Sequence, residues 1–543
     1  MGQQRRTKSA GPIVRGGTPV NRTPFILSAI AALAFSASPP ASSPARAEVT
    51  RIEFASKTPY GTFRPGEYVL WKGKVHGELA TSEAIPDLDK AKPNAKGKVE
   101  YTADLVLLMP ADPAKGNGTL LVDVPNRGRV YGVALYNSPR DEPFESGTLA
   151  QGTGFLEDRG FALAEVSWEL GKGAALPSFA GPDGKTRYVE GAGFAIMRDA
   201  ADFLAHGWAD SAGTANPLRG AVDRTLASGK SQSGRFLKTF LLNGFNRLHG
   251  RRVFDGMHVF VSGAGLLPIM QSATGPQSSA DAAPSFADPE FRGVHEGPFT
   301  IGEIIAKVEA RGEVPPKIVM ISSSTDYLSL RASMGRTGGA GTDEQAIPAN
   351  VRMYDIAGAS HAVLLKSDCK LPRERLDWSP VSRATLLHLD RWVGANTAPP
   401  ANRVMPLEPA TGDKEVLGAP AHLPKAVIER PKRDADGNVM GGVRLPDVTV
   451  PLGVHAAQQD PPSFACALAG AFLPFAPTKE ARETNKDPRP SIAERYAGRD
   501  DYVNKIRIAA RALQADGFLL PDDAAVIIAA AAAKQWPAAP VEK

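Results

Sequence analysis

The chain has 543 residues, of which 43% are hydrophobic and 22% are charged, and this composition excludes an intrinsically disordered protein. Its formal net charge is +5, but residues 1–47 contain six basic residues and no acidic one, so the remainder carries −1. The positive charge therefore belongs to the N-terminal segment, and it gives no support to nucleic-acid binding.

Residues 1–47 have the pattern of a signal peptide, with basic residues followed by an apolar run over residues 25–35 that is too short to span a bilayer. The run Ala45-Arg46-Ala47 then predicts cleavage before Glu48. We expect an exported protein, periplasmic or secreted, with no stable membrane insertion once the leader is removed. An uncleaved anchor is the alternative, and the Arg5-Arg6 pair leaves the general secretory and twin-arginine routes both open.

The next part of the chain, residues 48–110, is punctuated by Pro and Gly and predicts short strands that join a sheet. Beyond it, in residues 111–395, short apolar runs alternate with segments of helical periodicity. Strands are expected at residues 119–124, 161–166, 224–228, 257–261, 317–322 and 351–356, and helices at residues 192–205, 234–245 and 381–393. This alternation predicts a mostly parallel, doubly wound α/β sheet, with active-site loops after the C-terminal ends of the strands.

Two further regions flank or interrupt this core. Residues 263–316 form a long connection that we interpret as a lid insertion, with a simple packed insertion as the alternative. Residues 396–543 form a C-terminal extension, which is rich in loops at first and ends in helical patterns.

The number and spacing of the cysteines and histidines limit the metal sites that the chain can form. The two cysteines, Cys369 and Cys466, are predicted either to form one disulfide in an oxidising compartment or to remain as buried thiols. Two cysteines alone cannot build a structural zinc site, and the nine histidines show no metal-ligand spacing. We therefore predict no metal and no cofactor.

A candidate nucleophile lies in the run Gly229-Lys230-Ser231-Gln232-Ser233-Gly234, between a predicted strand and a predicted helix. A nucleophile elbow needs a serine with small residues two positions before and after it, and Gly229 and Ser233 meet this need around Ser231. Ser233 fits less well as the nucleophile, because Arg235 would follow it at the second position. A phosphate-binding loop is excluded, since its first glycine would fall at Arg224. A polar turn without catalytic function is the remaining alternative.

Chain order supplies an acid and a base for this serine. In α/β-hydrolases the nucleophile, acid and base follow one another on loops after successive strands. Asp326 and His361 occupy such loops, and Asp355 is a replacement candidate for the acid. The sequence therefore predicts an α/β-hydrolase fold with Ser231, Asp326 and His361 as catalytic residues.

The oxyanion hole should combine the backbone N–H of Gln232 with a donor from the loop after residues 119–124. That second donor is expected within Asn126, Arg127 and Gly128, with an ordinary turn as the alternative. The substrate pocket is predicted to be lined by apolar and aromatic residues of the lid and of the acid loop, namely Met270, Phe286, Phe291, Phe299 and Tyr327.

Long runs of this sequence resemble the bacterial secreted proteins named as alpha/beta hydrolase domain-containing. The resemblance covers most of residues 50–540 and includes VPNRG, SQSGRFLKTFL, GASH, DGNVMGGVRLPDVTVPLG and DPRPSIAERY. It implies a serine hydrolase fold with Ser231 and His361 in matching places, but it supplies no substrate. Where family members usually carry Glu-Tyr-Trp, this chain has Asp326-Tyr327-Leu328, in which aspartate can serve as the acid.

From the residues and the resemblance together we predict an exported carboxylic-ester hydrolase that acts through an acyl-enzyme on a small-molecule ester. The apolar lid residues point to hydrophobic or aromatic esters. A noncatalytic ligand-binding protein or an envelope protein on the same scaffold is the alternative.

Overall fold

A computed structural model describes residues 49–138, 149, 152–267, 298–338, 343–362, 369–410, 428–458 and 464–536. The chain divides into Met1–Arg46 and Ala47–Lys543, and every described residue belongs to the second unit. The predicted signal peptide lies outside the described residues.

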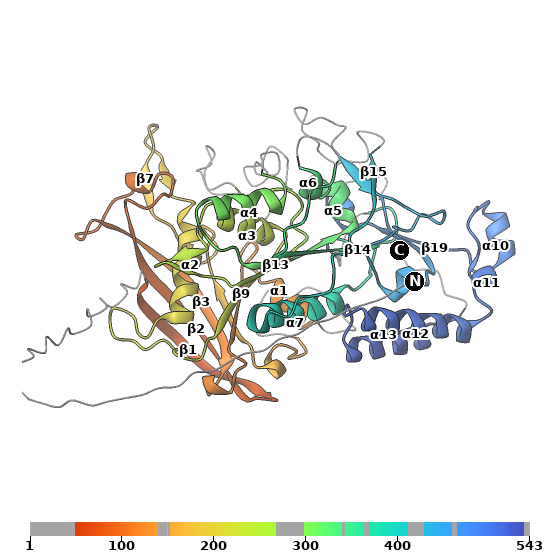
Figure 1. Cartoon of the computed structure of the whole chain (residues 1–543), viewed down its shortest axis with the longest axis horizontal. Helices are drawn as coiled ribbons and strands as arrows, with labels where there is room; N and C mark the ends of the chain where they lie inside the picture. Colours follow the sequence, from red (N-terminus) through yellow and green to blue (C-terminus); the bar gives the residue numbers. More distant parts are fainter. Residues whose placement is uncertain are drawn as a thin grey trace, which may run out of the picture. The chain divides into compact units, whose positions relative to one another are not determined.

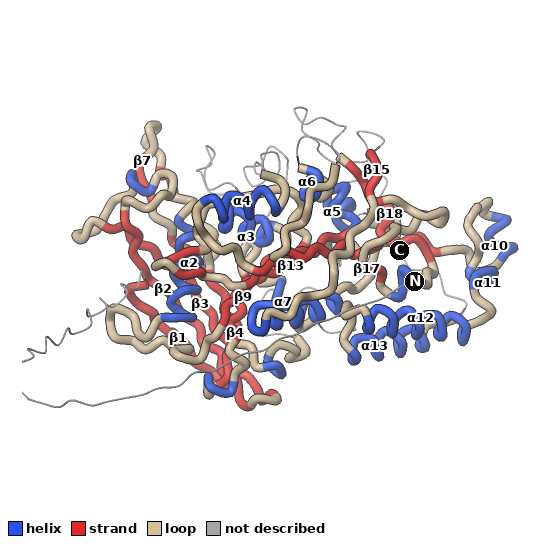
Figure 2. Tube along the Cα trace, viewed as in Figure 1, coloured by secondary structure: helices blue, strands red, loops and turns tan. Residues whose placement is uncertain are grey.

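The centre of the second unit is a mixed sheet with the strand order β1-β2-β3-β5-β4-β9-β12-β13-β14-β17, and β6 pairs with β3 beside this path. Figure 2 shows these strands running through the unit as one continuous layer. Its strands are β1 (Val49–Phe63), β2 (Gly66–Ala80), β3 (Lys98–Pro110), β4 (Thr119–Asp123), β5 (Ala162–Val166), β6 (Ala174–Ala175), β9 (Arg224–Lys230), β12 (Gly256–Phe260), β13 (Lys317–Ser323), β14 (Val351–Ala357) and β17 (Val443–Arg444).

The first three strands pair in antiparallel fashion and are longer than expected. The sequence predicted short strands over residues 48–110, whereas β1 and β2 span 15 residues each and β3 spans 13. Register irregularities interrupt the β1–β2 ladder, for example between Phe54 and Ser56, so the chain passes Gly and Pro without leaving the sheet. The prediction of short strands was therefore wrong in length, although their membership of the sheet is confirmed.

From β5 to β17 all neighbouring strands are parallel. Every residue of β4 and of β12 is buried, which explains why these strands appear as continuous apolar runs rather than alternating ones. All the strands predicted within residues 111–395 are present. Their C-terminal ends lie along one edge of the sheet, where the loops of an α/β protein carry its active site.

Helices cover both faces of the parallel strands (Figure 1). α3 and α4 lie on one face together with α2, and α1 and α7 lie on the other. Each face has its own apolar core, which is why the sheet strands had no polar face in the sequence. The bounds of these helices are α1 (Gly132–Tyr136), α2 (Ala192–His206), α3 (Gln232–Leu242), α4 (Ile301–Ala310) and α7 (Ser379–Ala395).

Part of the predicted lid is an ordinary crossover helix. α4 lies within residues 263–316 and connects β12 to β13, and its N-terminus is capped reciprocally by Thr300 and Glu303. Phe299, predicted to line the substrate pocket, is buried in a small cluster with Met334 and Ile428. Three other predicted lid residues, Met270, Phe286 and Phe291, lie outside the described residues.

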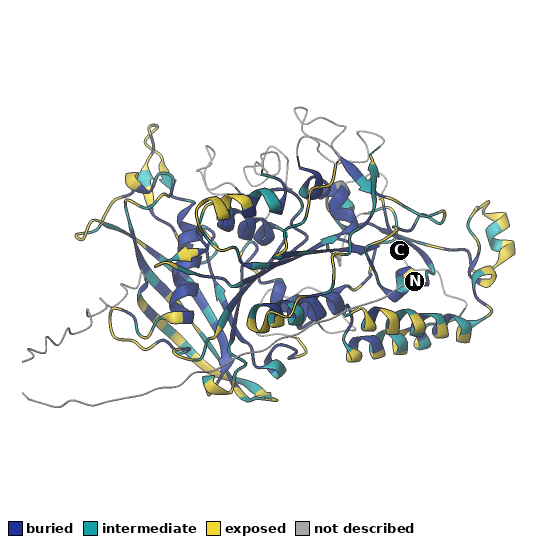
Figure 3. Cartoon of the chain, viewed as in Figure 1, coloured by how far each residue is buried: buried dark blue, intermediate teal, exposed yellow. Residues whose placement is uncertain are grey.

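The C-terminal extension adds small antiparallel strand pairs and a helical layer. Two of its strands, β18 (Gly453–Ala457) and β19 (Ala471–Pro474), pair with one another, and the two long helices α12 (Arg499–Ala515) and α13 (Pro521–Ala533) pack together. Figure 3 shows exposed residues along both helices on the side away from the core. Among the helices of the described ranges, none is long and apolar enough to span a bilayer.

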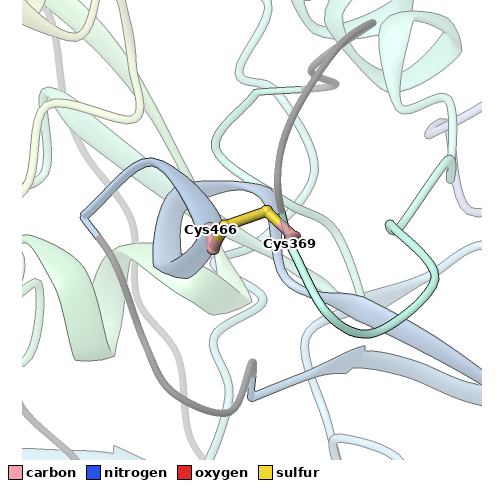
Figure 4. Close-up of a disulfide and its surroundings, with 2 residues drawn as sticks. All are labelled: Cys369 and Cys466. Carbon is pink, nitrogen blue, oxygen red and sulfur yellow. A yellow bond between two sulfur atoms is a disulfide. The ribbon is translucent and has the colours of Figure 1, made fainter.

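The extension is covalently linked to the core. Cys369, which follows the His361 loop, forms a disulfide with Cys466 in the short helix α9 (Phe464–Ala469), with a Cα–Cα distance of 5.6 Å (Figure 4). The bridge thus joins the segment after His361 to the extension, which is the first of the two alternatives that the sequence allowed.

Candidate active site

Ser231 sits on a strained turn at the end of β9. Its backbone angles are φ 59° and ψ −112°, a left-handed conformation that non-glycine residues rarely adopt, and helix α3 begins at the next residue. The Ser231 N–H donates to the carbonyl oxygen of Phe260 at 2.9 Å, which fixes the turn to the neighbouring strand β12. Strain at a serine between strand and helix is the local geometry that exposes a nucleophile.

Close packing explains the glycines around this turn. A Cβ atom on Gly229 would lie 2.5 Å from the Ser233 carbonyl oxygen, and one on Gly234 would lie 2.8 Å from the Ser262 Cβ. Ser233, the other candidate nucleophile, is fully buried, and its hydroxyl has no hydrogen-bond partner among the described residues. Ser231 is partly exposed, so it is the accessible hydroxyl of the two.

The candidate acid and base are in direct contact. Asp326 Oδ1 lies 2.7 Å from His361 Nδ1, and the two side chains are almost completely buried. Asp326 belongs to the first turn of α5 (Ser324–Ser329), where its other carboxylate oxygen accepts the Ser323 N–H at 2.7 Å. The carboxylate is therefore held in place by the helix cap and presents one oxygen to the imidazole.

The three candidates share one edge of the sheet. Ser231 follows β9, Asp326 follows β13 and His361 follows β14, and these strands are parallel with β12 between the first two. Parallel strands bring their C-terminal ends to the same edge, so the serine loop faces the same side as the Asp326–His361 pair.

Asp355, the replacement candidate for the acid, is used elsewhere. It is buried within β14, and its Oδ2 accepts hydrogen bonds from the Tyr327 hydroxyl at 2.7 Å and from the Met405 N–H at 2.9 Å. This also corrects the expectation for Tyr327, which was predicted to line the substrate pocket. Its side chain points into the core, because the short helix α5 turns Tyr327 away from Asp326 and towards Asp355.

The histidine loop is anchored by groups that the sequence did not identify. The His361 N–H lies 2.8 Å from Thr325 Oγ1 and 3.1 Å from the Leu468 carbonyl oxygen, and the Thr325 hydroxyl donates to that same carbonyl at 3.0 Å. Trp378 Nε1 donates to the Ser360 carbonyl at 3.2 Å. Leu468 lies in α9, two residues from the disulfide at Cys466. The position of Thr325 next to Asp326 in the sequence could have pointed to its role. Leu468 belongs to the distant extension, and no sequence pattern near it indicates a contact with His361.

Lys230, directly before the serine, is a further residue that the sequence did not single out. Its side chain is 7% exposed, and its Nζ lies 5.6 Å from the Tyr131 ring centre and 6.0 Å from that of Trp378. Burial lowers the pKa of Lys230 to about 8, although the negative charge of Asp326 acts in the opposite direction. A cationic group whose charge changes near pH 8 therefore lies close to the candidate acid.

The predicted oxyanion loop packs against the elbow. Asn126 Nδ2 donates to the Lys230 carbonyl at 2.9 Å, and the Arg127 N–H donates to Gln232 Oε1 at 3.2 Å. The Asn126 N–H is used within the loop, on the carbonyl of Arg129 at 2.7 Å. Gly128 completes the turn with φ 77°. The loop is thus held beside both residues that flank Ser231, and its Arg127 N–H already binds an amide oxygen.

Nothing in the described part of the chain forms a cluster that could hold a metal ion. The arrangement itself supplies a serine hydroxyl, a buried carboxylate–imidazole pair and backbone donors, which are the groups that nucleophilic acyl transfer uses.

Comparisons with known proteins agree on the fold. A model of the family described as alpha/beta hydrolase domain matches residues 66–529. A search of the curated proteins finds no match.

Solved structures of low sequence identity are also similar to parts of this chain. A glucuronoyl esterase from Solibacter usitatus is 16% identical, with 58% of this chain and 82% of that chain covered and a TM-score of 0.28. The rice cell wall degrading esterase LipA from Xanthomonas oryzae is 18% identical, with 40% and 50% covered and a TM-score of 0.22. Esterase B from Lactobacillus Rhamnosis is 12% identical, with 52% and 75% covered and a TM-score of 0.25. The family match, which spans most of the chain, and the mostly parallel sheet confirm the predicted fold and resemblance: the chain belongs to the alpha/beta hydrolase domain family.

Proposed function

We propose that the protein is an exported serine hydrolase that cleaves a small-molecule carboxylic ester through an acyl-enzyme, with Ser231, His361 and Asp326 as its catalytic residues. The observation that carries this proposal is the buried 2.7 Å contact between His361 and Asp326, at the sheet edge where strained Ser231 begins α3. Burial of a carboxylate–imidazole pair is costly unless its members bind each other, and its position at the same sheet edge as a strained serine favours catalysis over packing.

The reaction follows from these groups. Ser231 Oγ attacks the ester carbonyl carbon, while its proton passes to His361 Nε2, the ring nitrogen not used on Asp326. The tetrahedral intermediate then expels the alcohol, which takes the proton from His361 and leaves an ester on Ser231. Water attacks this acyl-enzyme with His361 again as base, and the carboxylic acid leaves as Ser231 regains its proton. Asp326 holds the imidazole tautomer and stabilises its cation throughout.

Backbone donors would stabilise the oxyanion. The Gln232 N–H follows the nucleophile directly, and the Arg127 N–H now donates to an uncharged amide oxygen, Gln232 Oε1. That oxygen stands in for the substrate oxygen, so a modest rotation of the Gln232 side chain would free the donor. Removal of one such donor costs roughly 10²–10³-fold in kcat in serine hydrolases.

Labelling by a fluorophosphonate probe tests the nucleophile without knowledge of the substrate. Such probes form a covalent bond with a serine activated by a base, so we expect intact mass to increase by one label in the wild type. Ser231→Ala should not be labelled, and Ser233→Ala, its matched control two residues away, should be labelled normally if it folds. A wild-type protein that resists the probe while folded would favour the noncatalytic ligand-binding alternative.

Export is a separate part of the proposal and rests on the signal-peptide pattern of residues 1–47. Expression of the full chain in a Gram-negative bacterium, followed by N-terminal sequencing of the periplasmic protein, checks it. We expect the sequence to begin at Glu48, and recovery of the intact chain from the cytosol would contradict export.

A further inference from the structure

A cavity lies in the C-terminal part of the molecule, and the candidate active site described above does not contribute to it. Its volume is about 320 Å³, which falls within the roughly 300–1,000 Å³ of small-molecule pockets. Among the described residues that line it, none is Ser231, Asp326 or His361. One wall is apolar and is formed by helix α13, through Val526, Ile527, Ala530 and Ala531.

The opposite wall contains a buried histidine that is held by a carboxylate. His455 Nδ1 lies 3.1 Å from Glu374 Oε2, and His455 is 6% exposed. Burial lowers the pKa of His455, but the charge and hydrogen bond of Glu374 act together with the charge of Asp447 and leave that pKa raised above its usual value. In its protonated form the ring carries an N–H at Nε2 as well as at Nδ1.

The Glu374 carboxylate already accepts several hydrogen bonds from the protein, so it has few acceptor positions left for a ligand. Glu374 Oε1 accepts the backbone N–H groups of Arg375 at 2.8 Å and of Leu376 at 2.9 Å, and its Oε2 accepts that of Ala456 at 2.8 Å. These bonds fix the carboxylate, which in turn fixes the orientation of the His455 ring.

The Nε2 of His455 has no hydrogen-bond partner within the part of the chain that the structure describes. His455 is 6% exposed and lines the cavity, so an acceptor bound there would take a hydrogen bond from this nitrogen. The exposed Arg375 side chain, which also lines the cavity, likewise has no partner in the described ranges.

The remaining charges of the lining favour an anion over a cation. Lys534 Nζ donates to Asp447 Oδ1 at 3.0 Å, so this carboxylate is already neutralised. Asp377 Oδ1 and Oδ2 accept the N–H and hydroxyl of Ser379, each at 2.9 Å. Asp523, the fourth carboxylate of the lining, accepts a hydrogen bond from Arg383 at 2.8 Å. Each carboxylate of the lining therefore binds a protein group, whereas His455 Nε2 and the Arg375 side chain have no partner among the described residues.

We propose that this cavity binds a monocarboxylate with an apolar body, whose carboxylate contacts His455 Nε2 and Arg375 and whose body packs against α13. A charge-assisted pair of bonds would hold the head, and the apolar wall would exclude water from the tail. The site is separate from the nucleophile, so it requires no hydrolytic activity and stands even if the proposed esterase function fails.

Calorimetric titration of residues 48–543 with octanoate tests the site, with octylamine and 1-octanol as probes of opposite and zero charge. We expect one octanoate per chain and binding at least about tenfold weaker for the other two compounds. Equal affinity for octylamine, or no octanoate binding at millimolar concentration, would overturn the proposal.

Variants locate the bound octanoate. Ala530→Trp fills the cavity from α13 and should abolish binding, whereas Ala529→Trp, its exposed neighbour outside the lining, should leave binding unchanged. His455→Gln and Arg375→Gln should each weaken binding by about tenfold or more while retaining the fold. Octanoate binding that survives both polar substitutions would assign the ligand to another place, such as the acyl pocket beside Ser231, and would refute the site.

Discussion

The backbone N–H of His361 points to the carbonyl oxygen of Leu468 at 3.1 Å, which ties the loop of the candidate base to the C-terminal extension. Leu468 lies two residues from Cys466, and the disulfide joins Cys466 to Cys369 beyond the other end of the same loop. These links close a ring of which the candidate base is a member. The ring consists of the chain from His361 to Cys369, the disulfide, the chain from Cys466 to Leu468 and the His361–Leu468 hydrogen bond.

Opening this ring should impair catalysis as well as stability. We expect Cys369→Ser/Cys466→Ser to lower kcat by roughly 10–100-fold, because a displacement near 1 Å of a catalytic group has an effect of that order. Loss of the crosslink should also lower the free energy of unfolding by about 2–5 kcal/mol. Steady-state kinetics well below the melting temperature, with and without dithiothreitol, measure the first effect.

A stability control separates the two effects. Ile506→Ala removes a fully buried side chain from α12 without touching the histidine loop, and it should lower the free energy of unfolding by about 2–5 kcal/mol. We expect its kcat to stay at the wild-type value. If Ile506→Ala lost as much kcat as the double cysteine variant, positioning by the disulfide would be wrong.

Two buried aspartates should respond differently to the same substitution. Asp326→Asn removes the charge that orients His361, and we expect kcat to fall by on the order of 10⁴-fold with little change in fold. Asp355→Asn disturbs a hydrogen-bonded core group, and we expect a loss of about 1–3 kcal/mol in unfolding free energy with kcat retained. Chemical denaturation and ester hydrolysis, measured on both variants, provide the comparison. The reverse pattern would make Asp355 the acid.

Lys230 should shape the pH profile of the reaction. Since burial lowers its pKa to about 8, the side chain is charged below that pH and neutral above it. A positive charge close to Asp326 at this edge of the sheet would favour the developing oxyanion, so kcat/KM of the wild type should decline as pH rises through about 8. Lys230→Met should have a lower kcat/KM at pH 7 and no decline at this pH. An unchanged alkaline limb in the variant would show that another group titrates there.

The sequence predicted the parallel core well because its strands are buried on both faces. Runs such as residues 119–124 and 257–261 have no polar alternation, and the helices between them have apolar residues at helical spacing, so each element was visible locally. The lengths of the paired strands β1 and β2 were underestimated, since their burial alternates irregularly, Gly interrupts both and Pro59 interrupts β1.

The order of the predicted elements along the chain was enough to predict the three candidate residues of the site. Ser231, Asp326 and His361 each follow a predicted strand, and the fold brings such positions to one edge. The groups that hold them were not predictable, because Leu468 and Trp378 reach the site through tertiary packing. Tyr327 was misassigned for a related reason: the direction of a side chain in the short helix α5 depends on its neighbour Asp355, which no sequence period reveals.

The most direct test of the central claim is hydrolysis of p-nitrophenyl esters of graded acyl length by residues 48–543, measured beside Ser231→Ala and Ser233→Ala. We predict turnover by the wild type and by Ser233→Ala, and a loss of at least about 10³-fold in kcat for Ser231→Ala with its fold intact. The acyl-length profile would then describe the pocket. Turnover that persists in folded Ser231→Ala would contradict the assignment of Ser231 as the nucleophile.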